Sequence, residues 1–132
     1  MTLHYKNLKL ELSKDVYEPA EDSFLLADAI VVNAGERVLD MGTGTGILAL
    51  LASANASRVL GIDINPSAVT LAQKNAKQNN ITNAEFRFGD LFSGVDGKFD
   101  VIIFNPPYLP LEEEGLLARA WSGGKNGIEV LG

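Results

Sequence analysis

The chain has 132 residues and no cysteine, so it can form one domain but neither disulfide bonds nor thiolate metal sites. Its formal net charge of −6 argues against a phosphate-backbone partner, because nucleic-acid binding usually needs a basic face. No apolar run approaches the ~20 residues that span a bilayer, and no basic-then-apolar leader opens the chain, so we expect a cytoplasmic protein. We expect a single domain over residues 1–132, with a strand and a helix in 1–35 and a ligand-binding core in 36–132.

The first elements are read from their hydrophobic periodicity. Leucines alternate with charged residues over 8–12, which predicts one half-exposed strand. Residues 16–19 then form a connector, in which a proline favours extended backbone. Residues 20–32 have apolar side chains at helical spacing, with Glu21 and Asp22 in the first turn, where the helix dipole favours acids. The sequence therefore predicts a strand followed by a helix.

The stretch that organises the chain is Arg37–Leu50, R-V-L-D-M-G-T-G-T-G-I-L-A-L. A buried strand ending at Asp40 is followed by three glycines at alternate positions, Gly42, Gly44 and Gly46. An apolar helix then starts at Ile47. Glycines allow a sharp turn and a close approach of a ligand to the backbone, and the start of the helix offers free N–H donors. A dinucleotide fingerprint would require glycine at position 47, so the loop fits a nucleoside cofactor better than a dinucleotide.

Strands and helices alternate through the rest of the readable pattern. Asn65 and Pro66 are typical of a helix start, as the N-cap and the first helical residue. The predicted elements are a strand at 58–63, a helix from 66 to about 79, a strand at 85–88 and a nearly all-apolar strand at 99–104. This order predicts an α/β fold with a Rossmann-like, doubly wound, mainly parallel sheet.

Polar residues follow four of the predicted strands, namely Asp40, Asp63, Asp90 and Asn105. Ligands of parallel sheets bind at the carboxyl ends of the strands, so these residues should converge on one rim. Asp63 is expected to accept hydrogen bonds from both ribose hydroxyls, and Asp90 to face the adenine end, with Leu91 as an apolar wall. Taken singly, Asp63 is equally well explained as a loop cap and Asp90 as a turn residue.

The sharpest local signal is Asn105-Pro106-Pro107-Tyr108. Two successive prolines fix the backbone and leave carbonyl acceptors without N–H donors. The Asn105 side-chain oxygen and the Pro106 carbonyl can accept both hydrogens of an –NH₂ group, while Tyr108 packs on its flat face. Such a clamp directs the nitrogen lone pair at an electrophile, which lowers the barrier through orientation. The plain alternative is a proline-rich turn that closes a strand.

These motifs together resemble a known family. V-L-D-M-G-T-G-T-G, G-I-D-I-N-P, G-D-L and F-N-P-P-Y, in this order, are similar to class I S-adenosylmethionine-dependent methyltransferases that act on planar or amino nitrogen. V-Y-E-P-A-E-D-S-F-L-L (16–26) and A-W-S-G-G-K-N-G-I-E-V (120–130) resemble the HemK/PrmC family, and within it the archaeal and eukaryotic branch. The resemblance implies methylation of the glutamine side-chain amide in the G-G-Q motif of class 1 peptide-release factors, with S-adenosyl-L-homocysteine as product.

The expected site follows from the motifs and the resemblance together. The resemblance implies that Tyr17, Pro19 and Ser23 border the cofactor; their plain alternative is a connector and a first helical turn. The expected catalytic residues are Asn105, Pro106, Pro107 and Tyr108, with no metal. The expected residues that bind S-adenosylmethionine are Tyr17, Pro19, Ser23, Asp40, Gly42, Thr43, Gly44, Gly46, Asp63, Ile64, Asp90, Leu91 and Asn105.

The resemblance also sets expectations for partners. Family members of this branch lack the bacterial N-terminal helical domain and work with a small zinc-binding activator subunit. Relatives continue beyond W-S-G-G-K-N-G with another helix and at least three strands, so we expect a methyltransferase domain whose C-terminal strands are missing. An incomplete sheet of this kind exposes an apolar edge.

Other functions remain open from the sequence. An exocyclic amino group of a nucleic-acid base offers the same hydrogens, and many nucleic-acid methyltransferases carry this four-residue loop. The acidic charge and the L-P-L-E-E-E-G run at 109–115 argue against it. Protein lysine is a third acceptor, and a non-catalytic cofactor-binding module is the alternative from another class. A nicotinamide-dependent dehydrogenase is disfavoured because His4 is the one histidine and no hydride-transfer pair is evident.

Overall fold

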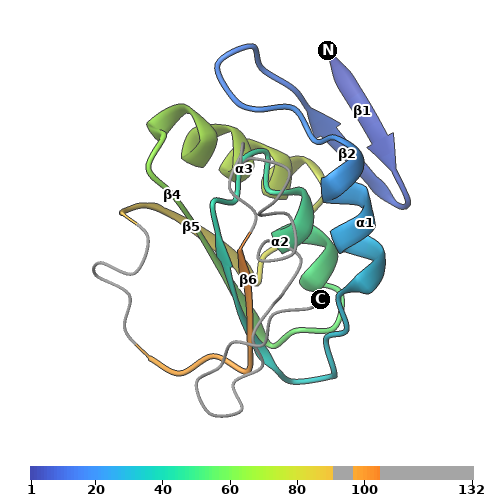
Figure 1. The fold of residues 1–132 in the computed structure, drawn as a ribbon, viewed down its shortest axis with the longest axis vertical. Helices are drawn as coiled ribbons and strands as arrows, with labels where there is room; N and C mark the ends of the chain where they lie inside the picture. Colours follow the sequence, from blue (N-terminus) through green and yellow to red (C-terminus); the bar gives the residue numbers. More distant parts are fainter. Residues whose placement is uncertain (91–96, 105–132) are drawn as a thin grey trace.

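The structure is a computed structural model that describes residues 1–90 and 97–104 (Figure 1). Its centre is a parallel four-stranded sheet with the strand order β5-β4-β3-β6. The strands are β3 (Arg37–Met41), β4 (Arg58–Asp63), β5 (Ala84–Phe88) and β6 (Val101–Phe104). The chain runs outward from β3 to β5 and then returns to β6 on the other side of β3. The predicted Rossmann-like parallel sheet is confirmed, and it has a topological switch point beside β3, where such sheets bind ligands.

The side chains of β3 alternate between the two faces of this sheet. Val38 belongs to the larger apolar cluster, to which the three described helices contribute residues such as Leu26, Leu48 and Ala72. Leu39 and Met41 point the other way and pack in a second cluster with residues of β4 and β6. Both faces of β3 are therefore apolar, as the near-continuous hydrophobic runs of these strands predict.

The three described helices are α1 (Glu21–Ala29), α2 (Ile47–Ala52) and α3 (Pro66–Gln78). The start of α3 is the predicted one, because the Asn65 side chain caps the helix by accepting a hydrogen bond from the Ser67 N–H at 3.0 Å. The prediction for α1 extended to residue 32, but the helix ends at Ala29. The run Ile-Val-Val at 30–32 consists of β-branched residues, which lose side-chain freedom in a helix and favour extended backbone.

The N-terminus forms a hairpin instead of the single predicted strand. β1 (Thr2–Tyr5) pairs antiparallel with β2 (Leu8–Glu11), with Lys6 in the left-handed region at φ 53° in the turn. Figure 1 shows this hairpin in blue beside α1 and α3. Tyr5 stacks on Phe24 of α1 with ring centroids 4.8 Å apart. The first strand was missed because it has four residues and only a partial alternation. In the described part of the chain, no helix is long and apolar enough to cross a membrane.

Close packing between neighbouring strands gives a stability prediction at Gly61. A Cβ atom at Gly61 would lie 2.5 Å from Phe86 Cδ1 and 2.8 Å from Thr43 Oγ1. We expect Gly61→Ala to lower the free energy of unfolding by roughly 1–3 kcal/mol, because a packed strand pair must move apart to admit one methyl group. Urea denaturation measures this loss. The double variant Gly61→Ala/Phe86→Leu should lose less than the sum of the two single changes, and strictly additive losses would contradict the packing argument.

Candidate active site

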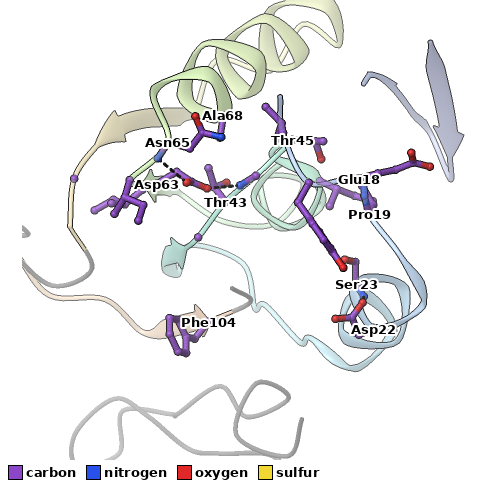
Figure 2. A pocket seen from close by; sticks show the side chains of 18 of the residues that line it. Glu18, Pro19, Asp22, Ser23, Thr43, Thr45, Asp63, Asn65, Ala68 and Phe104 are labelled. Carbon is purple, nitrogen blue, oxygen red and sulfur yellow. Dashed lines mark hydrogen bonds between the residues drawn. The ribbon is translucent and has the colours of Figure 1, made fainter. Parts of the chain in front are cut away.

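A cavity of about 550 Å³ opens at the carboxyl ends of the parallel strands, next to the switch point. This volume is in the range of small-molecule sites, roughly 300–1,000 Å³. Figure 2 shows that it lies between the start of α1, the glycine loop, the end of β4 and Phe104 at the end of β6. The described residues that line it are Val16, Tyr17, Glu18, Pro19, Asp22, Ser23, Gly42, Thr43, Gly44, Thr45, Ile47, Ile62, Asp63, Ile64, Asn65, Ala68, Gly89, Asp90 and Phe104.

Two glycines of the loop at 42–46 serve different purposes. Gly44 has φ +56°, and a Cβ there would have no atom within 4 Å, so its backbone faces the open space of the cavity. Gly46 has φ +91° and is the N-cap of α2; a Cβ there would lie 3.1 Å from the Cβ of Ala72. Gly46 therefore allows α3 to pack closely against the loop, while Gly44 leaves room for a ligand.

Hydrogen bonds hold the loop on both sides of its centre. The N–H groups of Gly42 and Thr43 donate to the Ile62 carbonyl at 2.7 and 3.0 Å. The Gly46 N–H donates to the Thr43 carbonyl at 2.8 Å. These bonds attach the loop to β4 and close its turn, so the loop has a fixed shape before a ligand arrives.

The peptide between Gly44 and Thr45 is different, because its polar groups are free. Neither the Gly44 carbonyl nor the Thr45 N–H has a hydrogen-bond partner among the described residues. The Thr45 hydroxyl is also buried and without a partner there. Both residues line the cavity. Buried polar atoms without partners, such as the Thr45 hydroxyl, are rare in folded proteins, so this part of the loop is a candidate contact for a polar ligand.

Asp63 holds the loop from the other side of the cavity. Its Oδ2 accepts a hydrogen bond from the Gly44 N–H at 2.9 Å, and its Oδ1 accepts one from the Asn65 N–H at 2.9 Å. Each oxygen of a carboxylate can accept two hydrogen bonds, so each has one acceptor position left for a ligand hydroxyl. Asp63 therefore has the capping role that the sequence offered, and its remaining acceptor positions leave the predicted role in diol binding possible in geometry.

The charge of the lining is strongly one-sided. Four carboxylic acids line the cavity, namely Glu18, Asp22, Asp63 and Asp90, and no lysine, arginine or histidine is among its described lining residues. Acidic side chains around a partly enclosed cavity concentrate negative potential inside it. The cavity therefore suits a ligand with positive charge and hydroxyl groups, and it does not suit the pyrophosphate of a dinucleotide.

Asp40 lies beneath the loop and not on the rim where the sequence placed it. Its side chain is 1% exposed, it does not line the cavity, and its Oδ2 accepts a hydrogen bond from the Thr43 hydroxyl at 2.8 Å. Burial raises the pKa of Asp40 from its ordinary 3.8 to about 7; the Thr43 bond opposes this shift, and the charge of Asp63 adds to it. Period-2 alternation explains the position, because Asp40 shares its face with Val38 under α2.

This raised pKa predicts a pH dependence of stability. The folded state holds a proton on Asp40 up to about pH 7, whereas the unfolded chain releases it near its ordinary pKa of 3.8. Stability from this group is therefore greatest at low pH and falls as the pH rises toward 7, by at most about 1.4 kcal/mol per pH unit. Asp40→Asn keeps an oxygen for Thr43 and removes the titration, so its free energy of unfolding should fall less over this interval. Parallel pH profiles for the two proteins, by urea denaturation without ligand, would contradict the assignment.

The structure brings most of the predicted site residues together. Nine of them line the cavity: Tyr17, Pro19, Ser23, Gly42, Thr43, Gly44, Asp63, Ile64 and Asp90. Asp40 and Gly46 do not, for the reasons given above. Leu91 and the N-P-P-Y residues Asn105, Pro106, Pro107 and Tyr108 lie outside the described residues, so their predicted roles stay predictions.

Sequence reasoning missed several lining residues with polar side chains. Thr45 stands inside the glycine loop, where its place between two glycines was the available signal. Glu18, directly before Pro19, and Asp22, three residues after it, are the two lining acids at the α1 side of the cavity. Asn65 was read only as a helix cap, yet it also lines the cavity.

Comparison with known proteins decides the family. The model of the methyltransferase small domain matches residues 13–118. A protein of Methanocaldococcus jannaschii, MJ0928, is 48% identical over 136 residues, which cover 99% of this chain and 68% of that protein. Its name proposes that it is a protein N5-glutamine methyltransferase. This chain belongs to the methyltransferase small domain family. Its resemblance to the HemK/PrmC methyltransferases is confirmed.

Further relatives support both the fold and the cofactor of this methyltransferase. The release factor glutamine methyltransferase of Rhodospirillum rubrum is 38% identical over 135 residues, which cover 91% of this chain and 42% of that protein. A solved S-adenosylmethionine-dependent methyltransferase of Thiobacillus denitrificans, in complex with S-adenosyl-L-homocysteine, matches with a TM-score of 0.57 and 26% identity. The match covers 70% of this chain and 40% of that structure. The chain thus spans about two thirds or less of the length of these relatives.

The residues of the cavity fit the cofactor of this family. S-adenosylmethionine has two cationic groups, a sulfonium and an ammonium, which suit the four acids of the lining. Its ribose diol matches the free acceptor positions of Asp63. The open space beside Gly44 and the unpartnered groups of Thr45 offer room and hydrogen bonds for its polar amino-acid end. The cofactor of this methyltransferase is S-adenosylmethionine.

Proposed function

We propose that this chain is the catalytic part of an enzyme that methylates the side-chain amide nitrogen of a protein glutamine. The substrate is the G-G-Q segment of a class 1 peptide-release factor. One observation carries the proposal furthest. Phe104, which ends β6 and lines the cofactor cavity, is followed directly in the sequence by Asn-Pro-Pro-Tyr. The residues suited to hold an –NH₂ group thus continue the chain from the wall of the cofactor site.

The proposed division of labour separates two sets of residues. Asp63 and the loop at 42–46 hold the cofactor, which supplies an electrophilic methyl group when it is bound. Asn105 and Pro106 accept the two amide hydrogens of the substrate and orient the nitrogen, and Tyr108 packs on the plane of the amide. Orientation of this kind accounts for much of the barrier reduction in reactions between two bound groups. The chain needs no strong base if the amide proton leaves after the methyl group has been transferred.

The names of two relatives support glutamine as the acceptor. One is proposed to be a protein N5-glutamine methyltransferase, and the other is named as a release factor glutamine methyltransferase. The net charge of −6 also favours a protein substrate over a nucleic-acid base, because the phosphate backbone would be repelled. A small zinc-binding activator subunit remains a prediction from the resemblance.

Transfer of labelled methyl groups tests this function. The protein is incubated with methyl-labelled S-adenosylmethionine and an extract of cells from which this protein has been deleted. The substrate in such an extract is unmodified, and any activator is present. We expect a labelled protein of release-factor size that resists nuclease and is digested by protease. Label that nuclease removes would contradict the proposal and support a nucleic-acid base as the acceptor.

A further inference from the structure

Asn75 of α3 is a fully buried amide whose partners are all backbone groups. Its exposed fraction is 0%. Its Oδ1 accepts a hydrogen bond from the Glu11 N–H at 2.7 Å, and its Nδ2 donates to the Glu11 carbonyl at 3.2 Å. The same Nδ2 donates to the carbonyl of Thr45 at 2.9 Å. One side chain therefore connects the N-terminal hairpin with the glycine loop.

Asn79, one helical turn later, provides a natural comparison. Its Oδ1 accepts from the Lys9 N–H at 2.9 Å, and its Nδ2 donates to the Lys9 carbonyl at 2.9 Å. Residues at i and i+4 lie on one face of a helix, so the two amides bind β2 at alternate residues, as a neighbouring strand would. Asn79 differs in its third contact, because its Nδ2 donates to the carbonyl of Asn75 and not to the loop.

The bond from Asn75 fixes one peptide of the loop at both ends. The Thr45 carbonyl is held by Asn75, and the Gly46 N–H of the same peptide donates to the Thr43 carbonyl. On the other side of Gly44, the Thr43–Gly44 peptide is held through the Gly44 N–H by Asp63. The Gly44–Thr45 peptide between them has free polar groups that face no described partner. The two fixed peptides therefore determine where these free groups point.

We propose that Asn75 is a positioning residue of the cofactor site, and that it holds the Gly44–Thr45 peptide in the orientation that binds S-adenosylmethionine. The inference rests on cofactor binding in the proposed function. Loss of the donor to Thr45 leaves a buried carbonyl unpaired and lets the Thr45–Gly46 peptide rotate. Part of the binding free energy of the cofactor is then spent on ordering the loop, and the affinity for the cofactor falls.

A purely structural role for Asn75 makes a different prediction. The hairpin is also held by Asn79 and by the stacking of Tyr5 on Phe24. If Asn75 served only to attach the hairpin, its loss and the loss of Asn79 would both lower stability and leave cofactor affinity alone. The two roles therefore differ in cofactor affinity, and stability alone does not separate them.

The test compares matched variants of the full chain. Asn75→Asp and Asn79→Asp each keep the oxygen that accepts from β2 and remove the two donated bonds. A second pair of variants avoids a buried charge, in case the aspartate at position 75 prevents folding. The side chain in Asn75→Ser is too short to reach β2 or the loop, and Asn79→Ser is its control. Calorimetry with S-adenosyl-L-homocysteine gives the dissociation constant, and thermal unfolding gives the melting temperature of each protein.

We expect the Asn75 variants to raise the dissociation constant by about 10-fold and the Asn79 variants to change it by less than about 2-fold. Both sets should lower the melting temperature. Wild-type affinity in a folded Asn75 variant would overturn the positioning role while leaving the proposed function intact. An equal loss of affinity in the Asn79 variants would also overturn it, because the effect would then belong to the hairpin as a whole. A wild-type chain that does not bind the ligand would overturn the cofactor assignment and this inference together.

Discussion

Asn105→Ala is expected to lower the rate of methyl transfer by on the order of 10²–10³-fold while the affinity for the cofactor stays nearly unchanged. In the proposed reaction the Asn105 side chain accepts a hydrogen from the substrate amide and orients its nitrogen. Removal of one such preorganised partner typically costs this much in turnover. Asn105 is also one of the residues expected at the cofactor, but its polar interaction in the proposed reaction is made with the substrate amide, so the effect should appear in the transfer step.

Two controls make the Asn105 result specific. Calorimetry with S-adenosyl-L-homocysteine should give nearly the wild-type dissociation constant, which shows that the cofactor cavity is intact. Asn33→Ala changes an asparagine that does not line the cavity, and this variant should transfer methyl groups at the wild-type rate. A variant at Asn105 that keeps full activity would show that the amide clamp is wrong.

Asp63→Ala is expected to weaken cofactor binding by more than the loss of a hydrogen bond between uncharged groups. The carboxylate holds the Gly44 and Asn65 N–H groups and has acceptor positions left for the ribose diol. Its loss removes the ligand contact and frees the loop at the same time. Charge-assisted hydrogen bonds contribute about 1.5–3 kcal/mol each, so we expect the dissociation constant to rise by about 10–100-fold.

Asp63→Asn separates the two roles of this side chain. The amide keeps one oxygen acceptor and has the same shape, but it loses the charge and one acceptor. We expect an intermediate loss of affinity and a melting temperature closer to wild type than that of Asp63→Ala. Asp90 is another acid of the cavity, but none of the hydrogen bonds among the described residues joins its side chain to the glycine loop. Asp90→Ala should therefore lower cofactor affinity less than Asp63→Ala does. Unchanged affinity in Asp63→Ala would contradict the placement of the ribose.

Much of the fold and part of the site could be predicted because their causes are local. The strand at 58–63 and the start of α3 at Asn65-Pro66 are as predicted, since apolar runs and capping residues act over a few neighbours. The convergence of Asp63 and Asp90 on the cavity follows from the geometry of a parallel sheet. The elements themselves, and the acids at the ends of the strands, are visible in short stretches of sequence.

The remaining features depend on partners that are distant in the sequence. Asn75 looks like an ordinary polar residue in a helix, and only the fold brings it to Glu11 and Thr45. Asp40 was placed on the rim because it ends a strand, but its place on the α2 face of the sheet buries it. Gly46 was expected to admit a ligand, whereas its close neighbour is Ala72 of α3. Tertiary packing decided these three positions, and for Asn75 and Gly46 no short stretch of the sequence indicates the distant partner.

The most direct measurement is the location of the transferred methyl group on a purified class 1 release factor. The factor is incubated with the protein and S-adenosylmethionine, supplemented with cell extract to supply any activator, and its peptides are sequenced by tandem mass spectrometry. We predict one added methyl group on the side-chain nitrogen of the glutamine in the G-G-Q segment, and no transfer to a factor in which that glutamine is replaced by alanine. A methyl group on another residue, or equal transfer to the alanine variant, would contradict the account.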